Sequence, residues 1–387
     1  MKTQKEWFDL GVNFGDSGMH KEAIEAYRQA IQIQPDNSST YNNLGTAYGK
    51  SGLHQEEIEA YQQAIGIEPD DATAHFNLGR AYGESGMYKE AMEEFRRTIQ
   101  IQPNKAIAHC GLGLAYKESG MYREAIEAFK RATLLQPDDA EIYNNLGLAY
   151  RESGRYREAI EAFKRAILLQ PDDAEIYNNL GTAYGKSKMN QEAIEAYIQA
   201  KRIQPNNAAI YNNLGTAYGK SGLHKEEIEA YQQAIGIEPD DATAHFNLGR
   251  AYGESGMYKE AIEVFKRTIQ LQPNKVTAHY ALGLAYRQLG MYKEAIEAFR
   301  GAIQIQPNDA TAHCGLGITY GKSDLHKDAV DAYIHAIKIK PDYTDAHYHL
   351  GIAYTRLNNR NAALREHSIL KKLDQQVADK LFNFINE

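Results

Sequence analysis

Residues 140–173 read AEIYNNLGLAYRESGRYREAIEAFKRAILLQPDD. It holds one proline, Pro171, and the ten prolines of the 387-residue chain stand 34 residues apart. Proline fixes its own φ angle and has no N–H to donate, so it ends a helix and does not continue one. Ten evenly spaced helix stops predict ten copies of one helical unit. The prolines are Pro35, Pro69, Pro103, Pro137, Pro171, Pro205, Pro239, Pro273, Pro307 and Pro341.

A 34-residue frame with proline at position 32 brings the other recurrent residues into register. Leucine and glycine occupy positions 7 and 8 in eleven successive frames, from Leu10 and Gly11 to Leu350 and Gly351. At about 100° per residue, positions 4, 7, 8 and 11 share one side of a helix, which must pack on another helix. Ser-Gly at positions 14 and 15 suits a helix cap, and a second helix with small or aromatic residues at positions 20, 24 and 27 follows. The frames begin at residues 4, 38, 72, 106, 140, 174, 208, 242, 276, 310 and 344.

These residues closely resemble the pattern of the tetratricopeptide repeat family, W-x2-L-G-x2-Y followed by A-x3-F and P. The resemblance covers nearly the whole chain and implies an all-α fold. It implies a right-handed α-solenoid superhelix of about eleven repeats, with the first helices lining the concave side. The departures, which we expect to change local packing but not the fold, are Glu57 and Glu227 for alanine at position 20 and Lys188, Asp324 and Asn358 for glycine at position 15.

The last repeat loses the pattern and is followed by a segment suited to cover the end of the stack. Gln375 stands where an eleventh proline would fall. Beyond it, apolar residues recur at helical spacing, which predicts a capping helix over about residues 376–386. We therefore expect one solenoid domain over residues 4–387. The apolar residues of the capping segment are Val377, Leu381, Phe384 and Ile385.

Two long blocks of the chain are close copies of each other. Residues 41–105 differ from residues 211–275 at five of 65 positions. Copies that have not diverged present nearly the same surface twice. This favours an extended, repetitive binding face over one specialised pocket.

Composition limits the classes of partner. The formal net charge is -8 and charges of both signs are interspersed, so we expect no nucleic-acid partner. The start of the chain has no apolar run long enough for a signal peptide, and no 18 apolar residues follow one another, so we expect a cytoplasmic protein without membrane insertion. Cys110 and Cys314 lie six repeats apart, beyond the reach of a disulfide, and should be free thiols.

Motifs that could carry chemistry are better explained by structure. Residues 15–18, Gly-Asp-Ser-Gly, resemble a protease nucleophile segment, but similar turns recur in other frames and indicate a helix cap. His109 and Cys110 are adjacent, so their side chains point about 100° apart on a helix and suit neither a catalytic pair nor joint metal ligation. We therefore expect no enzyme activity, no cofactor and no metal site.

Histidine replaces a packed aromatic residue at position 4 of six frames. We interpret these side chains as core imidazoles. A pH switch, in which burial depresses their pKa values, is the alternative. They are His75, His109, His245, His279, His313 and His347.

The candidate binding surface is the side of the first helix opposite the apolar stripe, at positions 2, 5, 6, 9, 12 and 13. Asparagine recurs there, and an amide both donates and accepts, so a column of asparagines can pair with the backbone of an extended peptide. Three aromatic residues at position 5, Phe76, Phe246 and Tyr280, are candidate apolar anchors. The polar candidates are Asn42, Asn43, Asn77, Arg80, Asn144, Asn145, Asn178, Asn179, Asn212, Asn213, Asn247 and Arg250.

Two functions fit this surface. The first is a non-enzymatic scaffold that binds extended segments of partner proteins in a concave groove lined by asparagine. The alternative is a structural protein whose near-identical repeats pack end to end or laterally into homo-oligomers or filaments.

Overall fold

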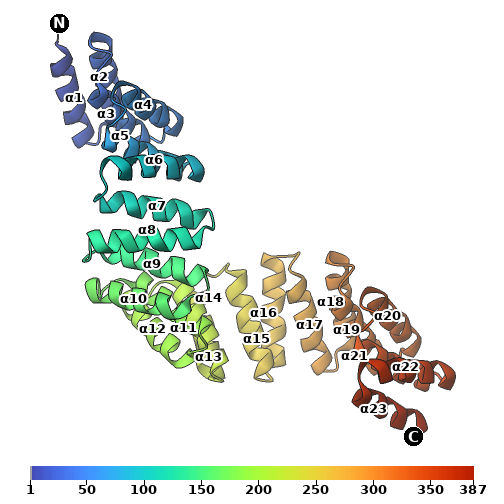
Figure 1. The fold of residues 1–387 in the computed structure, drawn as a ribbon. Helices are drawn as coiled ribbons and strands as arrows, with labels where there is room; N and C mark the ends of the chain where they lie inside the picture. Colours follow the sequence, from blue (N-terminus) through green and yellow to red (C-terminus); the bar gives the residue numbers. More distant parts are fainter. Residues whose placement is uncertain (1) are drawn as a thin grey trace. The chain divides into compact units, whose positions relative to one another are not determined.

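The computed structural model describes residues 2–387, and all regular secondary structure in this range is helical (Figure 1). Two helices fall in each 34-residue frame, and a final helix follows the last pair, which confirms the predicted repeat architecture. The helices are α1 (Gln4–Asp16), α2 (His20–Ile33), α3 (Ser38–Lys50), α4 (His54–Ile67), α5 (Ala72–Glu84), α6 (Tyr88–Ile101), α7 (Ala106–Glu118), α8 (Tyr122–Leu135), α9 (Ala140–Glu152), α10 (Tyr156–Leu169), α11 (Ala174–Lys186), α12 (Asn190–Ile203), α13 (Ala208–Lys220), α14 (His224–Ile237), α15 (Ala242–Glu254), α16 (Tyr258–Leu271), α17 (Val276–Gln288), α18 (Tyr292–Ile305), α19 (Ala310–Lys322), α20 (His326–Ile339), α21 (Thr344–Arg356), α22 (Arg360–Leu373) and α23 (Gln375–Asn386).

In most repeats an aspartate or asparagine after the proline caps the next first helix, whereas Lys105, Lys275 and Tyr343 make no such side-chain bond. Asp139 is typical: its Oδ1 accepts hydrogen bonds from the backbone N–H groups of Glu141 at 2.9 Å and Ile142 at 3.3 Å. These N–H groups have no partner inside α9, so the carboxylate satisfies donors that the helix itself cannot.

The turn within each repeat depends on a residue with positive φ at position 15. Gly154 has φ 78° in the turn between α9 and α10. Lys188, Asp324 and Asn358 occupy the same position with φ between 58° and 62°. The turn is therefore kept where glycine is absent, although a side chain there costs conformational energy.

Small residues at the predicted positions let the paired helices approach closely. Ala125, Phe129 and Ala132 of α8 are fully buried. A Cβ atom on Gly113 of α7 would lie 2.7 Å from the Phe129 ring. Glycine at position 8 therefore makes room for the aromatic ring at position 24 of the same repeat.

The described chain forms two compact units, Met1–Ile203 and Gln204–Glu387. Within each unit every helix packs on the next, and the first helix of a repeat also contacts the first helix of the following repeat. Second helices of successive repeats make no such contact within the described part of either unit. The first helices therefore lie on the tighter, inner side of each unit, as the resemblance implied. The proposal of one domain across both units stays a prediction.

The predicted capping helix is confirmed as α23. Leu381 is fully buried and lies against Gly351 of α21, where other repeats place the aromatic ring of position 24. Ala378 and Ile385 are also buried, and α23 contacts both α21 and α22. Position 24 of the last repeat is His367, and Leu381 of the cap takes the place over Gly351 that phenylalanine or tyrosine has in other repeats.

Candidate functional site

A cavity on the first-helix side of the N-terminal unit lies between α5, α7 and α9. Its volume is about 570 Å³. Phe76, Leu114 and Ile142 supply apolar walls from these three helices, and Phe95 of α6 lies behind them. Such a cavity can take one large apolar side chain of a ligand.

The cavity exists because two positions that elsewhere hold larger side chains hold small ones. Position 5 of this repeat is Cys110 and position 6 is Gly111, where the neighbouring repeat has Asn144 and Asn145. A Cβ atom on Gly111 would lie 2.7 Å from the Phe95 ring, so no larger residue fits without displacing that ring. The site is therefore an interruption of the asparagine column. Sequence analysis missed it, although the small residue at position 6 was a readable signal.

An equivalent cavity of about 320 Å³ lies between α15, α17 and α19 of the C-terminal unit. Phe246 and Arg250 line it at the positions that Phe76 and Arg80 hold in the first cavity, and Ala281 occupies position 6. Tyr280 takes the place of Cys110 and narrows the space. The duplicated surface thus contains two related pockets, whereas the sequence favoured an extended face without one.

The three aromatic candidates form walls of these cavities. Their rings are half-buried and pack on the aromatic residue of position 24, with ring centroids 5.7 Å apart for Phe76 and Phe95 and 5.9 Å for Phe246 and Phe265. Tyr280 packs on Phe299 at 5.4 Å. Each ring therefore presents only part of its surface to a ligand.

Several asparagines of the column bond to the next repeat. Asn77 donates from Nδ2 to Oδ1 of Asn42 at 3.0 Å, and Asn179 donates in the same way to Asn144 at 3.2 Å. Asn212 donates to Asp241 at 2.8 Å. These amides hold successive first helices in register, and each keeps unused hydrogen-bonding capacity. Asn145 and Asn179 are buried, whereas the half-buried members are Asn42, Asn43, Asn77, Asn144, Asn178, Asn212, Asn213 and Asn247.

Arg80 and Arg250 are exposed, and each is flanked by acidic groups. Arg80 Nε lies 3.7 Å from Glu84 Oε1, and Arg250 Nη1 lies 3.4 Å from Glu254 Oε1. Around the first cavity the remaining charged residues, Glu118, Asp139 and Glu141, are acidic. The rim therefore carries more negative than positive charge.

The histidines at position 4 share one hydrogen bond. In all six, Nε2 lies 2.9 to 3.0 Å from the carbonyl oxygen of the preceding proline. His75, His109 and His347 are buried as the core interpretation requires, whereas His245, His279 and His313 are only half-buried. The depression of pKa that the pH-switch alternative assumes does not hold for His347. A hydrogen bond to Glu366 raises the pKa of that imidazole against the opposing effect of burial.

The cysteines and the protease-like segment are structural. Both cysteines are free thiols, and burial raises the pKa of Cys110 to about 12 and that of Cys314 to about 11, which disfavours the reactive thiolate. In residues 15–18, Gly18 has φ 75° and ends α1, which confirms the cap. Within residues 2–387, no helix combines the length and apolar character needed to span a bilayer.

The comparisons with known proteins agree with this geometry. Models of the tetratricopeptide repeat match residues 4–37 and 246–310, and a TPR repeat model matches residues 226–256 and 326–358. A model described as the C-terminal domain of cilia and flagella-associated protein 70 matches residues 33–210. No catalytic family is among these models, and repeat scaffolds of this kind are generally non-enzymatic. None of the curated proteins matches the chain.

Solved structures of similar proteins are repeat proteins. A tetratricopeptide repeat protein from Parabacteroides merdae is 19% identical, with 64% of this chain and 98% of that chain covered and a TM-score of 0.50. The structure of MamA is 28% identical in sequence, with 44% of this chain and 94% of the MamA chain covered and a TM-score of 0.42. YrrB, described as a TPR protein with an unusual peptide-binding site, is 23% identical, with 48% and 96% covered and a TM-score of 0.43. The chain belongs to the tetratricopeptide repeat family.

Proposed function

We propose that this protein is an interaction scaffold that binds extended peptide segments along its first helices. The observation that carries the proposal is the 570 Å³ cavity between α5, α7 and α9, which opens among the residues predicted to bind peptide. Phe76 and Arg80 of the predicted set line it. A side chain such as leucine or phenylalanine from the ligand would bury its apolar surface there, which is worth about 1.5 to 3 kcal/mol.

The rim charges favour a particular ligand. Glu118, Asp139 and Glu141 face the same space as Arg80, so acidic groups outnumber basic ones. Complementary charge steers association and selects partners. We infer that the preferred segment carries an apolar anchor with lysine or arginine beside it.

Asparagines beside the cavity would hold the ligand backbone. Asn77 lies one position from Phe76 on α5, and Asn144 lies two positions from Ile142 on α9. Each net hydrogen bond contributes about 0.5 to 1.5 kcal/mol, and several of them with one buried anchor give roughly micromolar binding after ordering costs.

Selection of displayed peptides on the purified full-length protein tests the proposal. We expect the recovered peptides to share an apolar residue flanked by basic ones, and to bind the Ile107→Glu variant at least tenfold more weakly. Ile107 lines the cavity and is 54% exposed, so its substitution should leave the fold intact. Leu168→Glu is the matched control, because Leu168 is 74% exposed on α10 and does not line the cavity. An equal loss of peptide affinity in both variants, or an unchanged peptide affinity of Ile107→Glu, would reject this site.

A further inference from the structure

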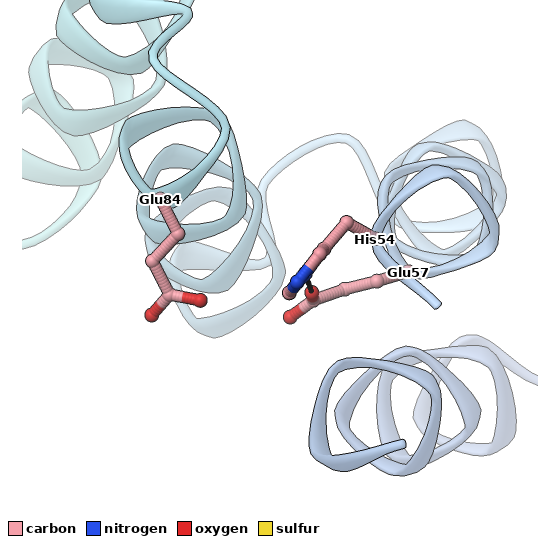
Figure 2. A group of neighbouring side chains, drawn as sticks. All are labelled: His54, Glu57 and Glu84. Carbon is pink, nitrogen blue, oxygen red and sulfur yellow. Dashed lines mark hydrogen bonds and ion pairs between the residues drawn. The ribbon is translucent and has the colours of Figure 1, made fainter. Parts of the chain in front are cut away.

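A second constellation lies where α4 begins and α5 ends. His54 is the first residue of α4, Glu57 follows one turn later, and Glu84 is the last residue of α5. Their potential ligand atoms all lie within 4.8 Å of one another. Figure 2 shows that the side chains come from neighbouring helices and share one region. His224, Glu227 and Glu254 form the same group in the C-terminal unit.

The central glutamate of each group replaces the alanine that the repeat pattern expects. Glu57 is 1% exposed and Glu227 is fully buried. A Cβ atom on Gly49 or Gly219 would collide with the respective carboxylate, so glycine at position 12 provides its space. At Gly83 and Gly253, whose own repeats keep alanine at position 20, no atom lies within 4 Å of the corresponding point.

Each buried carboxylate has one imidazole Nδ1 within hydrogen-bonding distance, that of His54 at 3.3 Å or that of His224 at 3.2 Å, which offsets only part of its lost hydration. Oε1 of Glu227 is buried without a hydrogen-bond partner. The guanidinium of Arg250 stays 3.7 Å from this oxygen, and that of Arg80 stays 4.0 Å from Oε1 of Glu57. Buried carboxylates are normally paired or coordinate a metal, and these point into a space shared with an imidazole and a third carboxylate.

The donor set and its spacing suit a transition metal. Imidazole nitrogen and carboxylate oxygen are both ligands of Zn²⁺, with bonds of about 2.0 to 2.2 Å. Tetrahedral ligands at that distance lie about 3.3 to 3.5 Å from each other. His54 Nδ1 lies 3.3 Å from Glu57 Oε2, and the equivalent distance in the second group is 3.2 Å.

The third ligand is free to move into place. Glu84 is 51% exposed and can change rotamer, and its ion pair with the 46% exposed Arg80 is a surface contact. Such contacts contribute little to stability, so a metal ion can displace the guanidinium at small cost.

We propose that His54, Glu57 and Glu84, and their copies His224, Glu227 and Glu254, each bind one divalent transition-metal ion of the Zn²⁺ class. A water molecule would complete each tetrahedron. The site spans two repeats in each case, so the ion would fasten one repeat to the next. This proposal is independent of peptide binding, because five of the six ligands lie outside the two cavities and its assay contains no peptide.

The test uses chelator-treated, dialysed full-length protein titrated with ZnCl₂ by calorimetry, with Co²⁺ absorption to report tetrahedral geometry. We expect two high-affinity sites per chain. Glu57→Gln and Glu227→Gln should each remove one site and the double variant both. His54→Asn gives a second route to the same loss at a side chain that is 54% exposed. Glu118→Gln is the control, since Glu118 also ends a first helix but has alanine at position 20 of the preceding repeat. A stoichiometry unchanged by the ligand variants, or no Zn²⁺ binding, would overturn the proposal.

Discussion

Nδ1 of His347 lies 2.6 Å from Oε2 of Glu366, while Nε2 of the same ring lies 2.9 Å from the carbonyl oxygen of Pro341. Both ring nitrogens thus face acceptors, which suits the doubly protonated, charged imidazole. The carboxylate holds the pKa of His347 above its ordinary value, although burial acts in the opposite direction. A buried ion pair therefore links α21 to α22 in the last repeat.

This pair predicts a stability that depends on pH. Because the folded pKa of His347 exceeds the ordinary 6.5, its contribution is fully present below pH 6.5 and is lost as pH rises through the folded pKa. Glu366→Gln should cost about 1.5 to 3 kcal/mol at pH 6, the usual range for a hydrogen bond to a charged group. The cost should shrink toward pH 9. Hydrogen exchange of α21 and α22, together with thermal unfolding, measures both values.

The exposed Glu161→Gln variant on α10 is the control, with an expected effect within about 0.5 kcal/mol at either pH. A cost for Glu366→Gln that stays constant from pH 6 to pH 9 would contradict the charged pair.

The close approach of Gly49 and the Glu57 carboxylate predicts that Gly49→Ala changes stability in opposite directions with and without that carboxylate. Gly49→Ala alone should destabilise the protein by about 1 to 3 kcal/mol, because the new methyl group overlaps the Glu57 carboxylate. In a Glu57→Ala background the same change should stabilise it by about 1 kcal/mol, since alanine is the better helix former. Chemical denaturation of the four proteins in chelator-containing buffer gives the coupling energy. Additive effects would show that the carboxylate does not occupy this space.

Substituting glycine for a residue that has positive φ in a turn should increase the stability of the fold. Lys188 has φ 62° at the position where most repeats have glycine. Lys188→Gly should stabilise the fold by roughly 0.5 to 1 kcal/mol, because a side chain in this conformation costs about 1 to 2 kcal/mol and glycine loses more chain entropy on folding. Asn358→Gly should gain less, since asparagine tolerates positive φ better. The thermal midpoints of the two variants measure both gains in stability. A gain for Asn358→Gly equal to or larger than that for Lys188→Gly would refute the strain at Lys188.

The fold was predictable from the sequence because several residues of each repeat independently specify the same pair of helices. Pro171, the glycine at position 8 and the aromatic residue at position 24 all specify the same helix pair, and neighbouring copies agree. Even the cap was readable, since Leu381 keeps helical spacing after the pattern fades. Its contact with Gly351 was not, because it joins residues of two different repeats.

The candidate site was harder to predict for a physical reason. A column of asparagines is visible in the sequence. Its amides also form hydrogen bonds between repeats, as Asn77 does with Asn42, and only the folded structure shows which amides are used in this way. A cavity is the absence of side chains, so Gly111 became informative only beside Phe95 and Leu114. The His54 group escaped notice because Glu84 joins it from another repeat.

The two cavities differ at a pair of equivalent residues, and this difference predicts which cavity can hold a peptide side chain. The prediction rests on the proposed peptide binding. Cys110 and Tyr280 are equivalent residues, and the ring of Tyr280 narrows the second cavity. Cys110→Tyr should close the first cavity and weaken a selected peptide at least tenfold, the loss expected from excluding one apolar anchor. Tyr280→Cys should open the second cavity and add a second site for the same peptide. Tyrosine already packs at the equivalent position of the second cavity, so neither change should disturb the fold. Calorimetric stoichiometry decides the matter: a peptide that binds Cys110→Tyr as tightly as the parent protein occupies some other surface.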